Sequence, residues 1–198
     1  FTTALLLNRV FCSRADVIYA ALHLPISMTI NDHFCRELAQ ATYEIVHEGR
    51  FANSTVQKKF RANPHWVAEE KSLFAESLYF ILRNWRRLCS ALSADSTSPS
   101  HETALHAVRA TLMLHSLPVP RALRQEFRLD AAALERSWSN AGSTRAVAYS
   151  YPDWLDSMGS SVFGSDWDAM VYALHAEPKV VLRANTLRIS RDELEVRL

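Results

Sequence analysis

Glycine is far below its usual share of about 7% of residues. The 198 positions contain only Gly49, Gly142, Gly159 and Gly164, which do not cluster. Loops that wrap a phosphate group, such as G-x-G-x-x-G and the P-loop, need several residues without a Cβ atom in one short stretch. The sequence therefore excludes a complete nucleotide-binding domain of the Rossmann kind. Scarce glycine combined with frequent alanine, leucine, arginine and glutamate also favours helices over sheets.

Cysteine is scarcer still, since Cys12, Cys35 and Cys89 are the only three, and no two of them form a C-x-x-C pair. Their odd number and wide spacing indicate neither a disulfide framework nor a zinc site. Each follows a bulky apolar residue, so we expect buried structural thiols rather than nucleophiles. This cysteine usage is typical of a reducing cytoplasm, which we predict as the location.

Long apolar runs and an excess of one charge are also missing. No stretch reaches the roughly 18 to 20 uncharged apolar residues of a membrane span, so we expect no membrane contact. The 22 basic residues balance 21 acidic ones, which leaves a formal net charge of +1 and only local patches to attract nucleic acid. His101 and His106 resemble the zinc motif H-E-x-x-H but lie five residues apart, which predicts no metal there.

Apolar residues recur at helical spacing along most of the chain, and this predicts a mainly α fold. A helical bundle is expected over residues 29–138, a polar linker over 139–150, and a helical connector with the start of an α/β subdomain over 151–198. The stretch 179–184 is β-prone, and Ser190 and Glu193 form a capping box that opens a last helix. The expected helices of the bundle span about 32–48, 54–61, 67–91, 101–115, 121–127 and 130–138.

The first 28 residues are expected to lie outside the native fold. Met28 stands just before the first strong helix start, and the apolar run before it is interrupted by Arg9, Arg14 and Asp16. The run also lacks the basic first segment of a signal peptide. We therefore predict that translation naturally begins at Met28 and that residues 1–27 are foreign to the fold.

Clusters of basic residues are the surface features that suggest a ligand. In the expected helix 67–91, apolar residues occupy a narrow arc and the arginines fall on the opposite side, which predicts a face of three arginines. Arginine suits phosphate because its planar guanidinium donates two parallel hydrogen bonds. A solvated face beside glutamates is the commoner meaning of such clusters. The clusters are Lys58, Lys59 and Arg61; Arg83, Arg86 and Arg87; and Arg121, Arg124 and Arg128.

The last part of the chain carries a motif. Tyr151-Pro-Asp-Trp-Leu155 opens a helix, Pro178 follows a helical spacer, and Leu182-Arg-Ala-Asn-Thr-Leu-Arg188 comes next. This order resembles the block ahead of the catalytic domain in the Sun/Fmu-type rRNA cytosine carbon-5 methyltransferases. Upstream, the stretch from Glu76 to Leu88 is similar to a helix of that family's N-terminal domain, which shares its fold with the antitermination factor NusB. The resemblance covers about residues 29–198.

The resemblance implies a NusB-like helical domain that binds rRNA, the start of an RRM-like subdomain near Val180, and a catalytic domain that uses S-adenosylmethionine. The glycine-rich cofactor loop and the family's paired cysteines, which follow Pro and Thr, are absent from this sequence. We therefore assign it neither a catalytic residue nor a cofactor. The expected RNA-binding residues are Lys58, Lys59, Arg61, Arg83, Arg86, Arg87, Arg183 and Asn185.

Two other interpretations stay open. In the first, the chain is a stand-alone NusB-like module of transcription antitermination, with no enzymatic role. In the second, it is a structural helical domain with no RNA partner. Packing and capping of the RRM-like sheet fits Asn185 as well as an RNA contact does. Trp85 and Trp154 are expected to be core anchors rather than platforms for stacking bases.

Overall fold

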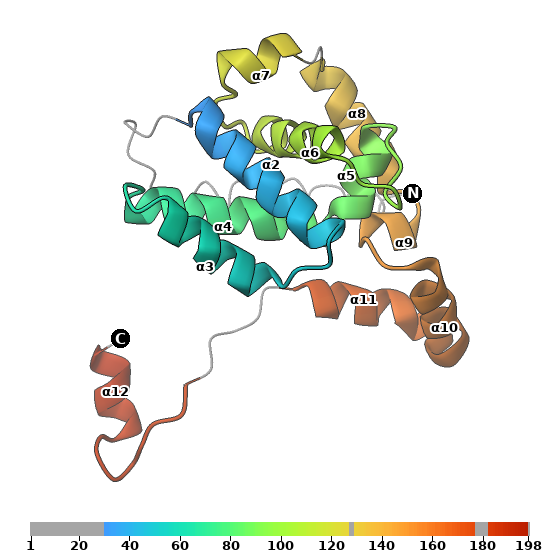
Figure 1. The fold of residues 1–198 in the computed structure, drawn as a ribbon. Coiled ribbons are helices and arrows are strands. Elements are labelled where there is room, and N and C mark those ends of the chain that lie inside the picture. The colour runs from blue at the N-terminus through green and yellow to red at the C-terminus, as the bar shows by residue number, and fades with distance from the viewer. Residues whose placement is uncertain (1–29, 127–128, 177–181, 198) are drawn as a thin grey trace. The chain divides into compact units, whose positions relative to one another are not determined.

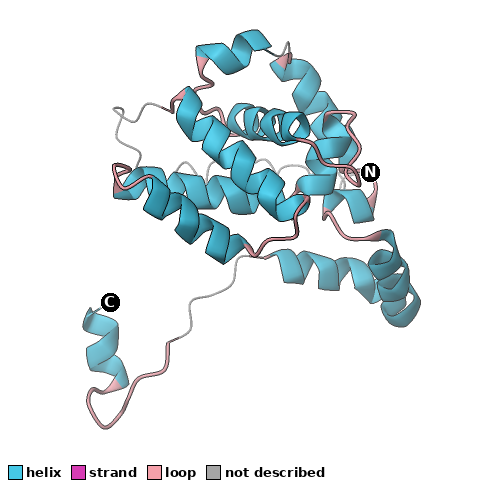
Figure 2. Ribbon diagram, in the orientation of Figure 1, coloured by secondary structure: helices cyan, strands magenta, loops and turns pink. Residues whose placement is uncertain are grey.

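The computed structural model describes residues 30–126, 129–176 and 182–197, and within these ranges it contains helices and no strand (Figures 1 and 2). The prediction of a mainly α fold is confirmed. The expected extension over 1–28 lies outside the described residues, as does the first half of the β-prone stretch 179–184. None of the described helices has the length and apolar character needed to cross a membrane. The chain divides into two compact units after Met158.

Side-chain caps fix the starts of several helices in the first unit. Asn31 accepts a hydrogen bond from the N–H of Phe34 at 2.8 Å, and Ser100 accepts one from the N–H of Thr103 at 3.0 Å. The helices are α2 (Asp32–Val46), α3 (Ala52–Ala62), α4 (Ala68–Arg83), α5 (Trp85–Ala91), α6 (His101–Leu114), α7 (Arg121–Glu126), α8 (Ala131–Ala141), α9 (Arg145–Ala148) and α10 (Asp153–Phe163), which continues into the second unit.

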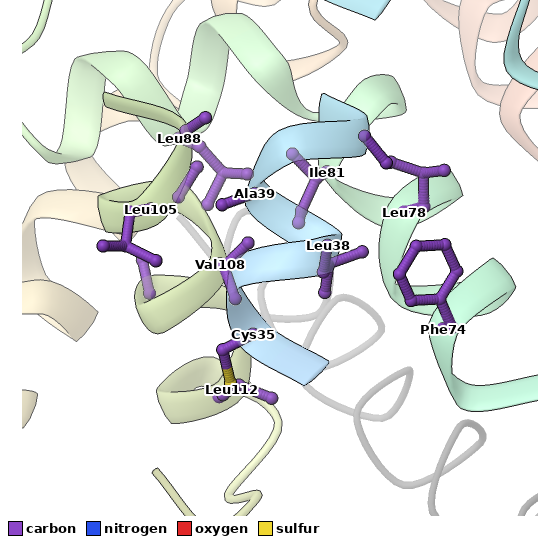
Figure 3. Packing of buried hydrophobic residues seen from close by; sticks show 14 of the residues in the cluster. Cys35, Leu38, Ala39, Phe74, Leu78, Ile81, Leu88, Leu105, Val108 and Leu112 are labelled. Atoms are coloured by element: carbon purple, nitrogen blue, oxygen red, sulfur yellow. The ribbon is translucent and has the colours of Figure 1, made fainter. Parts of the chain in front are cut away.

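Helix α2 is the centre of the first unit, since it packs against α3, α4 and α6. Leu38 is fully buried, and its side chain lies among apolar residues of α4 and α6 such as Leu78 and Val108 (Figure 3). Burying one such side chain contributes about 1.5–3 kcal/mol. Phe34 and Leu38 are four residues apart and both buried, so this apolar face of α2 holds the bundle together.

The prediction of one helix over 67–91 is wrong at Asn84, where α4 ends and α5 begins. The backbone of Asn84 leaves the helical region at φ −116° and ψ 18°. Its side-chain amide donates a hydrogen bond to the carbonyl of Phe80 at 2.9 Å. An asparagine that bonds the backbone in this way competes with the helical ladder. The chain therefore forms two helices here, although Ile81 of α4 and Trp85 and Leu88 of α5 are buried in the same core.

Residues 139–150 contain the end of α8 and all of α9. Both helices pack against α5, and Ala141 and Ala146 are buried. This stretch therefore belongs to the packed part of the first unit.

In the second unit, the 3₁₀ turn η1 (Gly164–Asp166) joins the end of α10 to α11 (Trp167–His175). Trp167 and Val171 are buried on one side of α11. The indole of Trp167 lies directly against the backbone of α10, because a Cβ atom built on Gly159 would lie 2.3 Å from its ring. The glycine is thus required by this close approach.

The capping box predicted at Ser190 is confirmed. Its hydroxyl accepts a hydrogen bond from the N–H of Glu193 at 3.2 Å, and the Glu193 carboxylate accepts one from the N–H of Ser190 at 3.0 Å. The hydrogen bonds that the Glu193 carboxylate accepts from the N–H and from the hydroxyl of Ser190 lower the pKa of this carboxyl. Helix α12 (Arg191–Arg197) follows.

The two tryptophans expected in the core differ. Trp85 is 8% exposed and donates its indole N–H to the carbonyl of Ser96 at 3.1 Å, so its prediction is confirmed. Trp154 is 65% exposed, so the expectation of a core anchor is wrong there. Trp154 lies in the first turn of α10, on a side of the helix that faces solvent.

Candidate nucleic-acid interface

The three basic residues of α3 point in different directions, because successive positions of a helix are rotated by about 100°. The ammonium of Lys59 is buried and lies 3.0 Å from a carboxylate oxygen of Glu37 and 3.7 Å from one of Glu44. Lys58 lies at the edge, 3.4 Å from the other oxygen of Glu44. Arg61 is exposed and has no partner among the described residues. Lys59 thus joins α3 to α2, and Arg61 faces solvent.

Glu44 is held charged by this cluster. Burial by itself would raise the pKa of the Glu44 carboxyl, but the hydrogen bond from Gln40 and the charges of Lys59 and Lys58 together outweigh it. The pKa is therefore lowered below its usual value. The two lysines already have a carboxylate to neutralise, which weakens any attraction that they offer to a phosphate.

Arg86 is engaged with the start of α10. Its guanidinium donates one hydrogen bond to the carbonyl of Tyr151 and another, at 2.9 Å, to the carboxylate of Asp153. Residues 151 and 153 lie in the stretch that the family resemblance singled out. Arg86 therefore attaches that motif to α5.

Arg87 is 8% exposed and belongs to the interior. Its Nε and Nη2 donate to the carbonyl of Trp138 at 3.3 and 3.1 Å. The same guanidinium stacks on the Trp138 ring, 4.0 Å from its centroid, and burial lowers the pKa of Arg87. Its backbone N–H donates to the hydroxyl of Ser150 at 3.4 Å.

The three-arginine face expected from the sequence is therefore not formed. Arg83 is exposed and without a partner in the described part of the chain, whereas Arg86 and Arg87 bind other segments of the first unit. The physical reasons are the helix break at Asn84 and the packing of α8 on α5.

Arg61 and Arg83, which stay exposed, are not brought together. Arg61 precedes the start of α4 and Arg83 ends that helix, whose 16 residues span about 24 Å at 1.5 Å each. Arg121 and Arg124 are exposed on α7, and Arg128 lies outside the described residues. Among the described residues of the first unit, these exposed cations thus lie on α3, α4 and α7 rather than on one helix face.

Arg183 and Asn185 are exposed in the second unit, in the stretch before α12. The side-chain oxygen of Asn185 accepts a hydrogen bond from the N–H of Leu187 at 3.2 Å, and its carbonyl accepts one from the N–H of Arg188 at 2.8 Å. Asn185 therefore stabilises a local turn. Arg188 and Arg191 are exposed near the same turn and were not expected as site residues. The signal for them is that residues 182–191 contain no acidic side chain.

A second group that the sequence did not reveal is a stack of three rings at the end of α2. Tyr43 stacks on His47 with ring centroids 4.7 Å apart, and on His101 of α6 with centroids 3.7 Å apart. The spacing of Tyr43 and His47 by four residues is visible in the sequence. His101 lies against Tyr43 only because the tertiary fold places the start of α6 beside the end of α2. Within residues 30–126, 129–176 and 182–197, no group of three His, Cys, Asp or Glu side chains is placed to hold a metal.

A comparison of this chain with protein-family models, with curated proteins and with solved structures finds no match in any of the three. A functional interpretation therefore depends on the motifs of the sequence and on the side chains that the structure leaves exposed.

Proposed function

We propose that this chain is the RNA-binding N-terminal part of an rRNA cytosine carbon-5 methyltransferase. The observation that supports the proposal is the turn at residues 182–191. The motif that resembles the family forms a turn organised by Asn185, and Arg183, Arg188 and Arg191 are exposed around it. Residues 182–191 contain no acidic side chain, and Asp192 and Glu193 follow in the first turn of α12. A turn of this kind offers several guanidinium groups to one length of RNA backbone.

The chemistry of such a turn fits phosphate. Each guanidinium presents a fork of N–H donors that matches two phosphate oxygens, and each neutralised phosphate releases counterions. The Asn185 oxygen is used within the turn, but its amide nitrogen has no partner among the described residues. That nitrogen is able to donate to a base or to a ribose hydroxyl.

In this proposal the first unit is a NusB-like domain that supports the grip on RNA. Arg61 and Arg83 add peripheral contacts to the backbone, while Lys59, Arg86 and Arg87 keep the helices in place. Lys58 contributes through its exposed side chain, which is shared with Glu44. The turn opens an RRM-like subdomain, and S-adenosylmethionine and the catalytic cysteines belong to a further domain. No catalytic step is assigned to residues of this chain.

The test is a titration of the full chain with a fluorescently labelled rRNA stem–loop at several salt concentrations. We expect affinity to fall as salt rises. The double change Arg183→Ala and Arg188→Ala weakens binding and lowers the salt slope by about 0.7 to 0.9 for each phosphate contact that is lost.

The matched control is Arg36→Ala, which removes an exposed arginine that is paired with Asp32 at the start of α2. This variant keeps the affinity and slope of the unaltered chain. The proposal is overturned if the chain does not bind the stem–loop at low salt, or if the double variant binds it as the unaltered chain does.

A further inference from the structure

The rings of His47, Tyr43 and His101 form a stack in which both imidazoles are exposed to solvent. The imidazole centroids lie 4.7 and 3.7 Å from the centroid of Tyr43, with interplanar angles of 19° and 23°. Two imidazoles at these distances would overlap if they shared one face of the phenol ring. They therefore cover its opposite faces, and the outer surfaces of the stack are the two exposed imidazoles.

The position of each ring is fixed by the backbone. His47 caps the C-terminus of α2, with its N–H bonded to the carbonyl of Tyr43 at 2.9 Å. His101 is the first residue of α6, and the cap at Ser100 holds the start of that helix. A preformed stack loses little conformational freedom when a further ring is added to it.

Arg50 lies close to the C-terminal end of α2, where His47 is located. Gly49 adopts a left-handed φ of 69°, and the N–H of Arg50 donates to the carbonyl of Glu44 in the last turn of α2 at 3.2 Å. The Arg50 side chain is 53% exposed, and only its Nε is engaged, with Glu48 at 2.7 Å. Its two terminal nitrogens have no partner in the described part of the chain. Phe51, the next residue, is 83% exposed.

We infer that the outer face of His47 receives an unpaired nucleobase of single-stranded RNA, whose backbone phosphate is bound by the terminal nitrogens of Arg50. Unstacked bases are commonly recognised by stacking on aromatic side chains, including histidine. His47 is favoured over His101 because the backbone of Arg50 returns to the end of α2 that carries His47, although Glu48 shares the Nε of this arginine. The inference rests on the proposed function and identifies a base contact in the first unit, separate from the turn at residues 182–191.

The test uses a short single-stranded RNA that carries 2-aminopurine at its centre, because stacking quenches the fluorescence of this base. With the full chain we expect quenching on binding. His47→Ala removes the outer ring, abolishes the quenching and weakens binding by about five- to 150-fold, the range expected for one base–aromatic stack. His47→Phe retains a ring and restores both readouts.

Two further variants separate the contacts. Arg50→Ala lowers the salt slope by about one phosphate contact and keeps the quenching. His65→Ala, an exposed histidine in the loop between α3 and α4, changes neither readout. Circular dichroism confirms that each variant is folded.

The results distinguish the two proposals. If the chain binds the RNA but His47→Ala quenches and binds like the unaltered chain, the base platform is overturned and RNA binding stands. The platform is also overturned if His65→Ala loses as much affinity as His47→Ala. If the unaltered chain does not bind RNA, the proposed function fails and the platform with it.

Discussion

The guanidinium of Arg87 is bound twice by the same residue, since it stacks on the Trp138 ring 4.0 Å from the centroid and donates hydrogen bonds to the Trp138 carbonyl. The two residues are 51 positions apart and join α5 to α8. Gly142 also packs against this guanidinium, because a Cβ atom built on Gly142 would lie 2.8 Å from Arg87 Nη2. Arg87, which the sequence pattern assigns to RNA binding, therefore stabilises the packing of α5 against α8.

Replacing Arg87 by lysine is expected to destabilise the chain by about 1–3 kcal/mol, because lysine keeps the charge but loses the planar stack and the paired donors. Urea unfolding followed by circular dichroism measures the change. Arg83→Lys, at an exposed position without a partner in the described residues, is the control and changes the free energy of unfolding by less than about 0.5 kcal/mol. Equal unfolding midpoints for the two variants would contradict this role of Arg87.

The carboxylate of Glu44 makes stability depend on pH. Because its pKa is lower in the folded chain than its ordinary value of 4.5, its contribution is complete above about pH 4.5 and is lost as the pH falls through the folded value. Glu44→Gln is expected to cost about 2 kcal/mol at pH 7, since Lys59 loses a buried partner. The difference from the unaltered chain shrinks as the pH falls below 4.5.

Urea titrations between neutral and acidic pH measure this difference. Glu48→Gln is the control, since Glu48 forms an exposed pair with Arg50 and such pairs contribute little. A gap between Glu44→Gln and the unaltered chain that stays constant from neutral pH to pH 3 would refute the assignment.

The thiols of Cys35 and Cys89 are expected to be unreactive in the folded chain. Burial, the largest cause, raises the pKa of each to about 12, with smaller contributions from the nearby charges of Asp32 and Asp95. The thiolate is the nucleophile, and these values leave almost none at neutral pH. Iodoacetamide labelling followed by peptide mass spectrometry should modify both cysteines only in denaturant. Labelling in native buffer at the rate of added glutathione would show that they are accessible.

Gly159→Ala is expected to separate α11 from α10, because the new methyl group would lie 2.3 Å from the Trp167 ring. Overpacking of this size costs about 1–3 kcal/mol, which corresponds to roughly five- to 150-fold faster hydrogen exchange of the α11 amides. Ser161→Ala, at an exposed position of α10, leaves these rates unchanged. Unchanged exchange in Gly159→Ala would mean that the ring does not rest on this backbone.

The helices and the core were largely predictable because one physical signal determines both. Phe34 and Leu38 recur at the helical period, and a periodic apolar face has to be buried. Asn84 shows where this signal ends, since the apolar pattern continues through a residue whose side chain bonds the backbone and interrupts the helix. Periodicity reports which side of a helix is buried, but it does not detect a local competitor for its hydrogen bonds.

The candidate site was predicted less well, because charge in a sequence does not reveal its partner. Lys59 and Arg87 look like surface cations until Glu37 and Trp138 are brought to them by other helices. The turn at Asn185 was recognisable from its residues because its hydrogen bonds are local. The stack on Tyr43 was missed because His101 comes from a position 58 residues away.

The long separation between Arg87 and Trp138 also affects the helices that their contact joins. Joining them closes a loop of 51 residues, an entropic cost of roughly 3.5 kcal/mol that no contact within α5 or α8 repays. Helices α8 and α9 both pack on α5, the helix that carries Arg87. We therefore expect loss of the Arg87–Trp138 contact to loosen α8 and α9 more than the α2–α4–α6 core.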